Sequence, residues 1–210
     1  VEPVLGKTRR HFVILATLLG CGGKEEFEVR LPQALDAGVT PTQVREIVYQ
    51  GTAYLGMGRV RGFVDIMNRV FTSRGVKLPL PDTTEQKDVE RVVKGEAAQV
   101  EIFGPGMKGF SKSGPEKTVA IRRWHSANCF GDYYTRGGLD YKQREMITFC
   151  FLAALGGCEP QLTSHAGANL RIGNDNAFLI QVISQCLPYI GYPRSLNALR
   201  CVNDAAQAAR

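Results

Sequence analysis

The sequence predicts an all-α protein built from two tandem helical modules, and three observations support this fold class. First, the segment from Arg9 to about Arg69 returns 135 positions later, from Arg144 to Asp204, without a gap. Second, glycines occupy matching places in the two copies: Gly22 and Gly157, Gly38 and Gly173, Gly56 and Gly191. Third, no stretch sustains the apolar–polar alternation typical of strands. A repeat of this length indicates a duplicated helical module rather than a short solenoid unit.

The first module, residues 1–75, is expected to contain four helices. They cover about Thr8–Leu19, Lys24–Ala37, the stretch from Thr40 to Gly56, and Val60–Phe71. Pro32 lies inside the second helix and should kink or break it, because proline lacks a backbone donor. The third helix is the best defined, since Thr40 and Gln43 have capping-box spacing around a proline at the first helical position.

Residues 76–115 differ in composition and are expected to form a linker with one helix. Two prolines keep the run Leu78–Pro81 extended. Thr83–Gln86 is then predicted to cap a polar helix. The apolar residues that this helix should bury are Val89, Val92 and Val93. A loop rich in glycine, serine and lysine completes the linker.

The second module, residues 116–210, is expected to mirror the first. Its predicted helices cover about Lys117–Cys129, Tyr141–Leu155, Glu159–Ile172, Asp175–Leu187 and Ser195–Ala209. Asn174 or Asp175 is the expected N-cap of the fourth of these, since both residue types accept hydrogen bonds from free helical N–H groups.

Composition and charge exclude several classes of protein. The net charge is +6, but the basic residues are spread along the chain, which disfavours a nucleic-acid interface and is compatible with small anionic substrates. The longest apolar run, Met146–Leu155, is short of the roughly 18 residues of a membrane helix. Six cysteines without a C-x-x-C pair indicate reduced thiols, which favours the cytoplasm. The chain begins at Val1 rather than methionine, so a removed leader stays open.

Three segments of the second module form a characteristic series. The first comprises Phe130–Asp140 and Arg144–Thr148, the second is Cys158–His165, and the third is Tyr189–Ala198, with the pattern Tyr-x-Gly-x-Pro-x-x-x-Asn-Ala. Together they resemble the carboxymuconolactone decarboxylase family, whose second helix ends in a histidine. The first module resembles this family more faintly: it keeps Tyr54-Leu55-Gly56 but has Gly58 in place of the proline.

The resemblance implies an all-helical fold of alkylhydroperoxidase D-like modules that assemble into rings, commonly hexamers. Two fused modules would form a homotrimer with the same six-module outline. The named activity of the family is decarboxylation of a lactone dicarboxylate, which requires no cofactor and no metal. A neighbouring branch, alkylhydroperoxidase D, acts through a C-x-x-C pair, a histidine four residues later and an upstream glutamate.

Candidate site residues follow from this resemblance and from the difference between the two copies. His165 stands where the first copy has Arg30, so the second module is expected to be the active one. We expect His165 to be the acid/base, which requires its imidazole to face an enclosed cleft; the alternative is a core histidine with a satisfied hydrogen bond. Cys158 and Glu145 are the other candidate catalytic residues, with buried filler and an exposed ion pair as their respective alternatives.

Arginines and one tyrosine are the candidate substrate ligands. Arg194 or Arg136 could bind a substrate carboxylate through the guanidinium fork, and Tyr189 could lie at the pocket rim. Thiol peroxidase chemistry is disfavoured, because the position three after Cys158 is Gln161 and a resolving cysteine is missing. The open alternatives to a decarboxylase are therefore a peroxidase of this kind and a non-catalytic helical oligomer that binds a small ligand.

Overall fold

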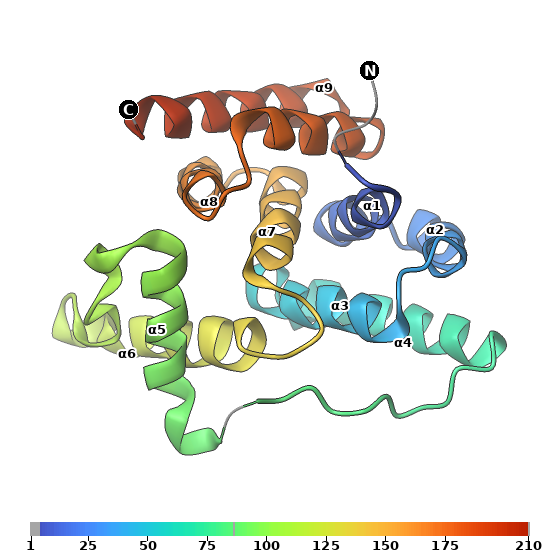
Figure 1. Cartoon of the computed structure of the whole chain (residues 1–210), viewed down its shortest axis with the longest axis horizontal. Helices are drawn as coiled ribbons and strands as arrows, with labels where there is room; N and C mark the ends of the chain where they lie inside the picture. Colours follow the sequence, from blue (N-terminus) through green and yellow to red (C-terminus); the bar gives the residue numbers. More distant parts are fainter. Residues whose placement is uncertain (1–4, 86, 210) are drawn as a thin grey trace.

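The computed structural model describes residues 5–85 and 87–209, and the regular secondary structure in this part of the chain is all helical, with no β-strand (Figure 1). Four helices form the first half: α1 (Lys7–Cys21), α2 (Lys24–Asp36), α3 (Pro41–Leu55) and α4 (Met57–Ser73). The second half consists of α7 (Tyr141–Leu155), α8 (Glu159–Arg171) and α9 (Asn176–Ala208), which is broken at Gly191.

The helix bounds of the two halves recur with the sequence offset. Adding 135 to the bounds of α2 gives those of α8, and adding it to α3 and α4 gives the parts of α9 before and after Gly191. The break itself recurs, since Gly56 has φ 77° and Gly191 has φ 75°, a conformation that glycine adopts without strain. The two expected helices at the C-terminus thus meet at Gly191. An origin by duplication stays a prediction.

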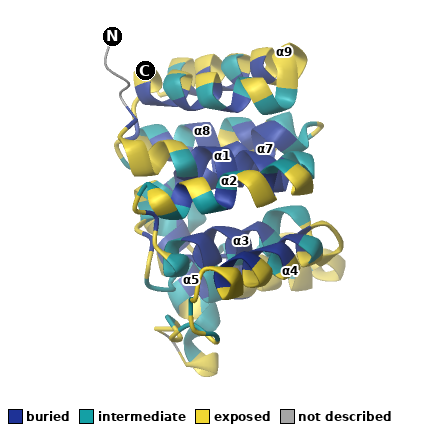
Figure 2. Ribbon diagram, turned by 90° about the vertical axis from the view of Figure 1, so that its right-hand side faces the viewer, coloured by how far each residue is buried: buried dark blue, intermediate teal, exposed yellow. Residues whose placement is uncertain are grey.

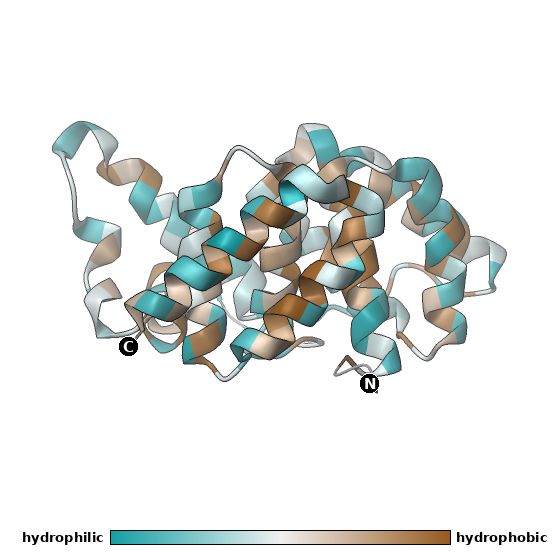
Figure 3. Ribbon diagram, turned by 90° about the horizontal axis from the view of Figure 1, so that it is seen from above, coloured by the Kyte–Doolittle hydropathy of each residue, from teal (hydrophilic) through white to brown (hydrophobic). Residues whose placement is uncertain are grey.

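A single hydrophobic core joins the halves, with α1 and α7 packed side by side at its centre (Figure 2). Every residue of α7 from Arg144 to Ala154 is buried. The helices approach closely because α1 carries Gly20, where an added Cβ would lie 2.7 Å from the Cβ of Ala154. α9 crosses the top of the molecule, with hydrophobic and hydrophilic residues alternating along it (Figure 3).

Buried charge also connects the two halves. Glu46 of α3 is fully buried and accepts hydrogen bonds from Arg136 at 3.0 Å and from Arg144 at 3.3 Å. Burial alone would raise the pKa of Glu46, but hydrogen bonds from Arg136 and Thr83 and the charges of both arginines lower it. Arg144 also donates to Gln50 Oε1 at 2.9 Å, so the first turn of α7 is anchored in α3.

A second, smaller core lies between α5 (Arg91–Phe103) and the π-helical segment η5 (His125–Tyr134). These helices are in near contact, because an added Cβ at Gly95 would lie 1.8 Å from the carbonyl oxygen of Ser126. α5 therefore turns its small residues inward. The expected burial of Val89 and Val93 is wrong: they are 88% and 72% exposed.

Three other local expectations need correction. Pro32 does not break α2, which runs without interruption from Lys24 to Asp36 and keeps Leu31 and Ala34 buried. The expected cap at Thr83–Gln86 is not formed as proposed: Gln86 lies outside the described residues, helical structure begins at Asp88, and Thr83 donates to Glu46.

The expected helix Lys117–Cys129 is a 3₁₀ turn (Glu116–Thr118), a short helix α6 (Val119–Trp124) and the start of η5. The caps of α3 and α9 are confirmed, with Thr40 accepting from the N–H of Gln43 and Asp175 from that of Phe178. No helix in the described ranges combines the length and the apolar character that crossing a bilayer demands.

Candidate active site

A buried carboxylate–imidazole pair lies where α7 packs on α8. Glu145 Oε2 and His165 Nδ1 are 2.8 Å apart, and the Glu145 side chain is fully buried. Asn169 holds the two helices together by donating to the carbonyl oxygens of Glu145 at 3.1 Å and of His165 at 2.8 Å. The alternative of an exposed ion pair for Glu145 is therefore wrong.

Tyr134 links this pair to a larger polar network. Its hydroxyl donates to Glu145 Oε1 at 2.7 Å and lies 2.8 Å from Thr148 Oγ1 and 2.9 Å from the hydroxyl of Tyr54. Burial raises the pKa of both tyrosines well above the ordinary value, so both phenols stay protonated near neutral pH. We call Glu145, His165, Tyr134, Thr148, Tyr54 and Gln50 the polar network.

Two members of the polar network come from the first half of the chain. Gln50 donates to Thr148 Oγ1 at 2.8 Å, and the Tyr54 ring makes a T-shaped contact with His165, with centroids 5.5 Å apart. Both residues lie on α3. Both halves of the chain therefore contribute residues to the site, which the sequence patterns did not predict.

Aromatic rings cover the imidazole. Phe103, at the end of α5, makes a second T-shaped contact with His165 at 5.1 Å, and the histidine is only 7% exposed. His125 lies on the far side of this cluster, where its ring packs on Phe130. Burial, together with the charge of His165, lowers the pKa of His125 to about 4, so His125 is neutral at physiological pH.

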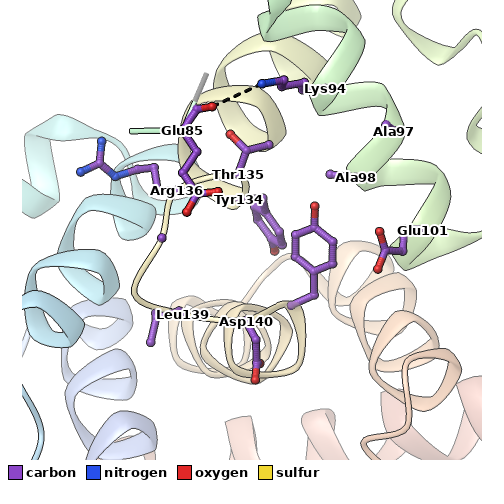
Figure 4. Close-up of a pocket in the computed structure, with 12 residues that line it drawn as sticks. Glu85, Lys94, Ala97, Ala98, Glu101, Tyr134, Thr135, Arg136, Leu139 and Asp140 are labelled. Carbon is purple, nitrogen blue, oxygen red and sulfur yellow. Dashed lines mark hydrogen bonds between the residues drawn. The ribbon is translucent and has the colours of Figure 1, made fainter. Parts of the chain in front are cut away.

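Two pockets approach the network from different sides. One, of about 570 Å³, is lined by Tyr134, Arg136 and Tyr141 and by α5 (Figure 4). The other, of about 370 Å³, is lined by Phe103 and by Arg171 of α8. Neither has His165 in its wall. Aromatic packing thus takes the place of the enclosed cleft expected at the imidazole, with Phe103 between the ring and the smaller pocket.

The remaining candidate residues lie elsewhere. Cys158 is half-buried with Sγ 3.4 Å from the carbonyl oxygen of Leu152, and burial, Glu159 and Cys201 raise the pKa of its thiol. A raised pKa disfavours the thiolate that redox chemistry needs. Arg194 is exposed and donates to the carbonyl oxygen of Ala154 at 2.6 Å. Ala154 is nine residues along α7 from Glu145, about 13 Å.

Arg136 and Tyr189 also have other partners. Arg136 is bonded to Glu46 and lines the larger pocket. Tyr189 packs against the main core, with the guanidinium of Arg30 5.9 Å from its ring centroid. Of the predicted site residues, the structure brings together only Glu145 and His165. Across the described ranges, no three histidine, cysteine or acidic side chains group in a way that could hold a metal ion.

Comparison with known proteins bears on this geometry. Residues 121–204 match the model of the carboxymuconolactone decarboxylase family. The match covers 84 of the 210 residues, so this part of the chain is similar to that family. The decarboxylase-family segment contains Glu145, His165, Tyr134 and Thr148, whereas Tyr54, Gln50 and Phe103 lie outside it. No curated protein matches the chain.

Sequence reasoning missed three residues around the acid–base pair, Tyr134, Tyr54 and Phe103. It also missed Arg171, which lines the smaller pocket. Tyr134 lies within the run Phe130–Asp140 that carries the resemblance, and Tyr54 is the counterpart of Tyr189, so both had a signal. Phe103 and Arg171 had none, because their positions depend on how α5 packs over α8.

Proposed function

We propose that the protein is a cofactor-free lyase that decarboxylates a small anionic lactone or a related ring compound, with His165 as acid/base. The observation that carries this proposal is the buried 2.8 Å pair of Glu145 and His165 within the decarboxylase-family segment. A carboxylate that accepts the Nδ1 hydrogen orients the ring and leaves Nε2 as the reacting atom.

The decarboxylation can be written with the substrate, His165, Glu145 and solvent. When the carboxylate carbon–carbon bond breaks, carbon dioxide leaves and the electron pair passes into the conjugated lactone carbonyl, giving a dienolate. His165 Nε2 then donates its proton to carbon, and solvent restores that proton. General acid catalysis of this kind contributes about 10²–10⁴-fold to a rate. Glu145 stabilises the imidazolium form that donates.

Access to Nε2 requires a rearrangement beside the smaller pocket. We place the substrate in the pocket lined by Phe103 and Arg171, with the Phe103 ring displaced when substrate enters. Phe103 is followed by Gly104, which has φ 105°, and by Gly106, so the chain there is permissive. The Arg171 side chain has no ion pair among the described residues, so its guanidinium N–H groups are available to bind a substrate carboxylate.

The raised pKa of Cys158 and the missing resolving cysteine count against the peroxidase alternative. Cys129 is the thiol nearest the network, through Tyr54, and burial raises its pKa to about 12. Neither thiol is therefore suited to attack a hydroperoxide at neutral pH.

The test is turnover of a panel of lactone dicarboxylates in D₂O, followed by NMR as loss of substrate and deuterium incorporation at carbon. His165→Gln and Glu145→Gln should lower kcat by about 100-fold or more, in line with the loss of general acid catalysis. The matched control is His125→Gln, which should keep near-normal activity at pH 7.5 because that imidazole is already neutral.

Access is tested separately by chemical modification. Phe103→Ala should increase the rate at which diethyl pyrocarbonate modifies His165, measured by mass spectrometry. Full activity of folded His165→Gln would refute the acid/base role. Binding of the lactones without turnover by the wild-type chain would instead support the non-catalytic alternative.

A further inference from the structure

The first half carries a second polar cluster at the position that corresponds to the acid–base pair. With the offset of 135, Arg10 corresponds to Glu145 and Arg30 to His165, and the bounds of the helices that carry them agree to within one residue. With the same offset, Tyr54 corresponds to Tyr189 and Gln50 corresponds to Gln185. Both positions of the acid–base pair are therefore occupied by arginine in the first half.

The aromatic contact of Arg30 matches that of His165. Arg30 lies over the ring of Tyr189, 5.9 Å from its centroid, as His165 lies against the ring of Tyr54. Arg10 Nε donates to Gln185 Oε1 at 2.8 Å, joining α1 to α9. Each half thus supplies a tyrosine and a glutamine to the cluster of the other half. In both clusters the other half supplies these two residues, but the second cluster has two arginines in place of a carboxylate and an imidazole.

Positive charge is in excess at this second cluster. Arg30 is paired with Glu26 at 2.7 Å, but Arg10 bonds only the neutral amide of Gln185 among the described residues. The pKa of His11 is lowered by burial and then by the charges of Arg10, Lys7 and Arg30. Gln185 and Tyr189, the partners of Arg10 and Arg30, are four residues apart on α9, so the two arginines contact the same face of that helix.

A buried polar atom also lacks a partner here. His11 Nδ1 is buried and has no hydrogen-bond partner among the residues that the structure describes. The N-terminus of α1 has Gly6 as its N-cap, without a side-chain cap bond, and no acidic residue in its first turn. Helix N-termini favour negative charge, and guanidinium groups bind carboxylates and phosphates through paired donors.

We propose that Arg10 and Arg30 form a binding site for a small oxyanion, a carboxylate or a phosphate group, beside the ring of Tyr189. In this site the two arginines occupy the positions that correspond to Glu145 and His165 in the second half. Each guanidinium retains N–H groups beyond those bonded to Gln185, Glu26 and Gln33. The proposal does not depend on the activity proposed for His165.

The test is an NMR titration of the intact protein at constant ionic strength, in which the imidazole signals of His11 report binding. Inorganic phosphate is the probe in one arm and maleate in the other, so the two arms separate phosphate from carboxylate recognition. Saturable shifts of the His11 signals and a rise in the pKa of His11 on binding are expected in at least one arm.

Variants decide whether the arginines are responsible. Arg30→Gln and Arg10→Gln should each weaken binding by at least tenfold, whereas Arg30→Lys should weaken it less because the charge remains. Arg61→Gln is the matched control, since Arg61 is exposed, carries the same charge and has no ion pair in the described ranges. Should Arg30→Gln fail to fold by circular dichroism, Arg10→Gln and Arg30→Lys still test the site.

Two results would overturn the proposal. One is an absence of saturable change at His11 with either probe. The other is equal weakening by Arg61→Gln and Arg30→Gln, which would indicate diffuse attraction by the net charge of the chain.

Discussion

Replacing Tyr134 by phenylalanine removes one oxygen atom from the centre of the polar network. That oxygen donates to the buried carboxylate of Glu145 at 2.7 Å and lies 2.9 Å from the hydroxyl of Tyr54. A hydrogen bond to a charged group contributes about 1.5–3 kcal/mol and a neutral one about 1 kcal/mol. Thr148 retains its bond from Gln50, so the losses fall on Glu145 and Tyr54. We therefore expect Tyr134→Phe to lower the free energy of unfolding by about 3 kcal/mol.

Urea unfolding, followed by circular dichroism, measures this difference. Tyr141→Phe is the matched control, because it removes the same atom from a half-buried tyrosine 6.4 Å away, centroid to centroid, that makes no side-chain hydrogen bond in the described part of the chain. The control should change the free energy of unfolding by less than about 0.5 kcal/mol. Tyr134 would not be the centre of the network if both variants lost the same free energy of unfolding, or if Tyr134→Phe lost less than about 0.5 kcal/mol.

Three further predictions concern pH, packing and assembly. The pKa of His125 is lowered from 6.5 to about 4, so the unfolded chain binds the proton more readily than the folded one. The neutral imidazole of His125 contributes fully to stability above pH 6.5, and this contribution is lost as the pH falls toward 4, by about 1.4 kcal/mol per pH unit. In urea unfolding, His125→Gln should therefore make the decline in the free energy of unfolding between pH 6.5 and 5 smaller by about 2 kcal/mol. An unchanged decline in the variant would contradict this. Gly95→Ala should destabilise the chain by more than about 3 kcal/mol, since its Cβ would lie 1.8 Å from the Ser126 carbonyl oxygen, whereas Gly58→Ala, with open space around it, should be neutral or stabilising in thermal unfolding. Light scattering should give about three times the 23.1 kDa chain mass if the expected trimer forms, and a monomer mass would reject it.

Local sequence signals predicted helix starts correctly where the determinants are adjacent in the chain. Thr40 and Gln43 satisfy each other within one turn, so their capping box could be recognised without any tertiary information. Pro32 shows the opposite case. Its local cost is outweighed because Leu31 and Ala34 on either side are buried in the core.

Other features depend on contacts between segments far apart in the sequence. Val93 of α5 faces outward because the approach of η5 requires Gly95 on the inner side. The acid–base pair could be anticipated from Glu145 and His165, since both lie in the family segment. Their coverage by Tyr54 and Phe103 could not, because neither residue is near His165 in sequence and neither belongs to that segment.

The buried contacts of Arg144 have a consequence for dissection of the chain. Its guanidinium is fully buried, and its carboxylate partner Glu46 and amide partner Gln50 both belong to α3. A fragment that began after α4 would leave this cation without a counterion inside an apolar helix interface, at a cost of several kcal/mol. Such a fragment would have to open its first turn to solvent or borrow a carboxylate from another molecule. We therefore expect that the segment that carries the family signature does not fold on its own.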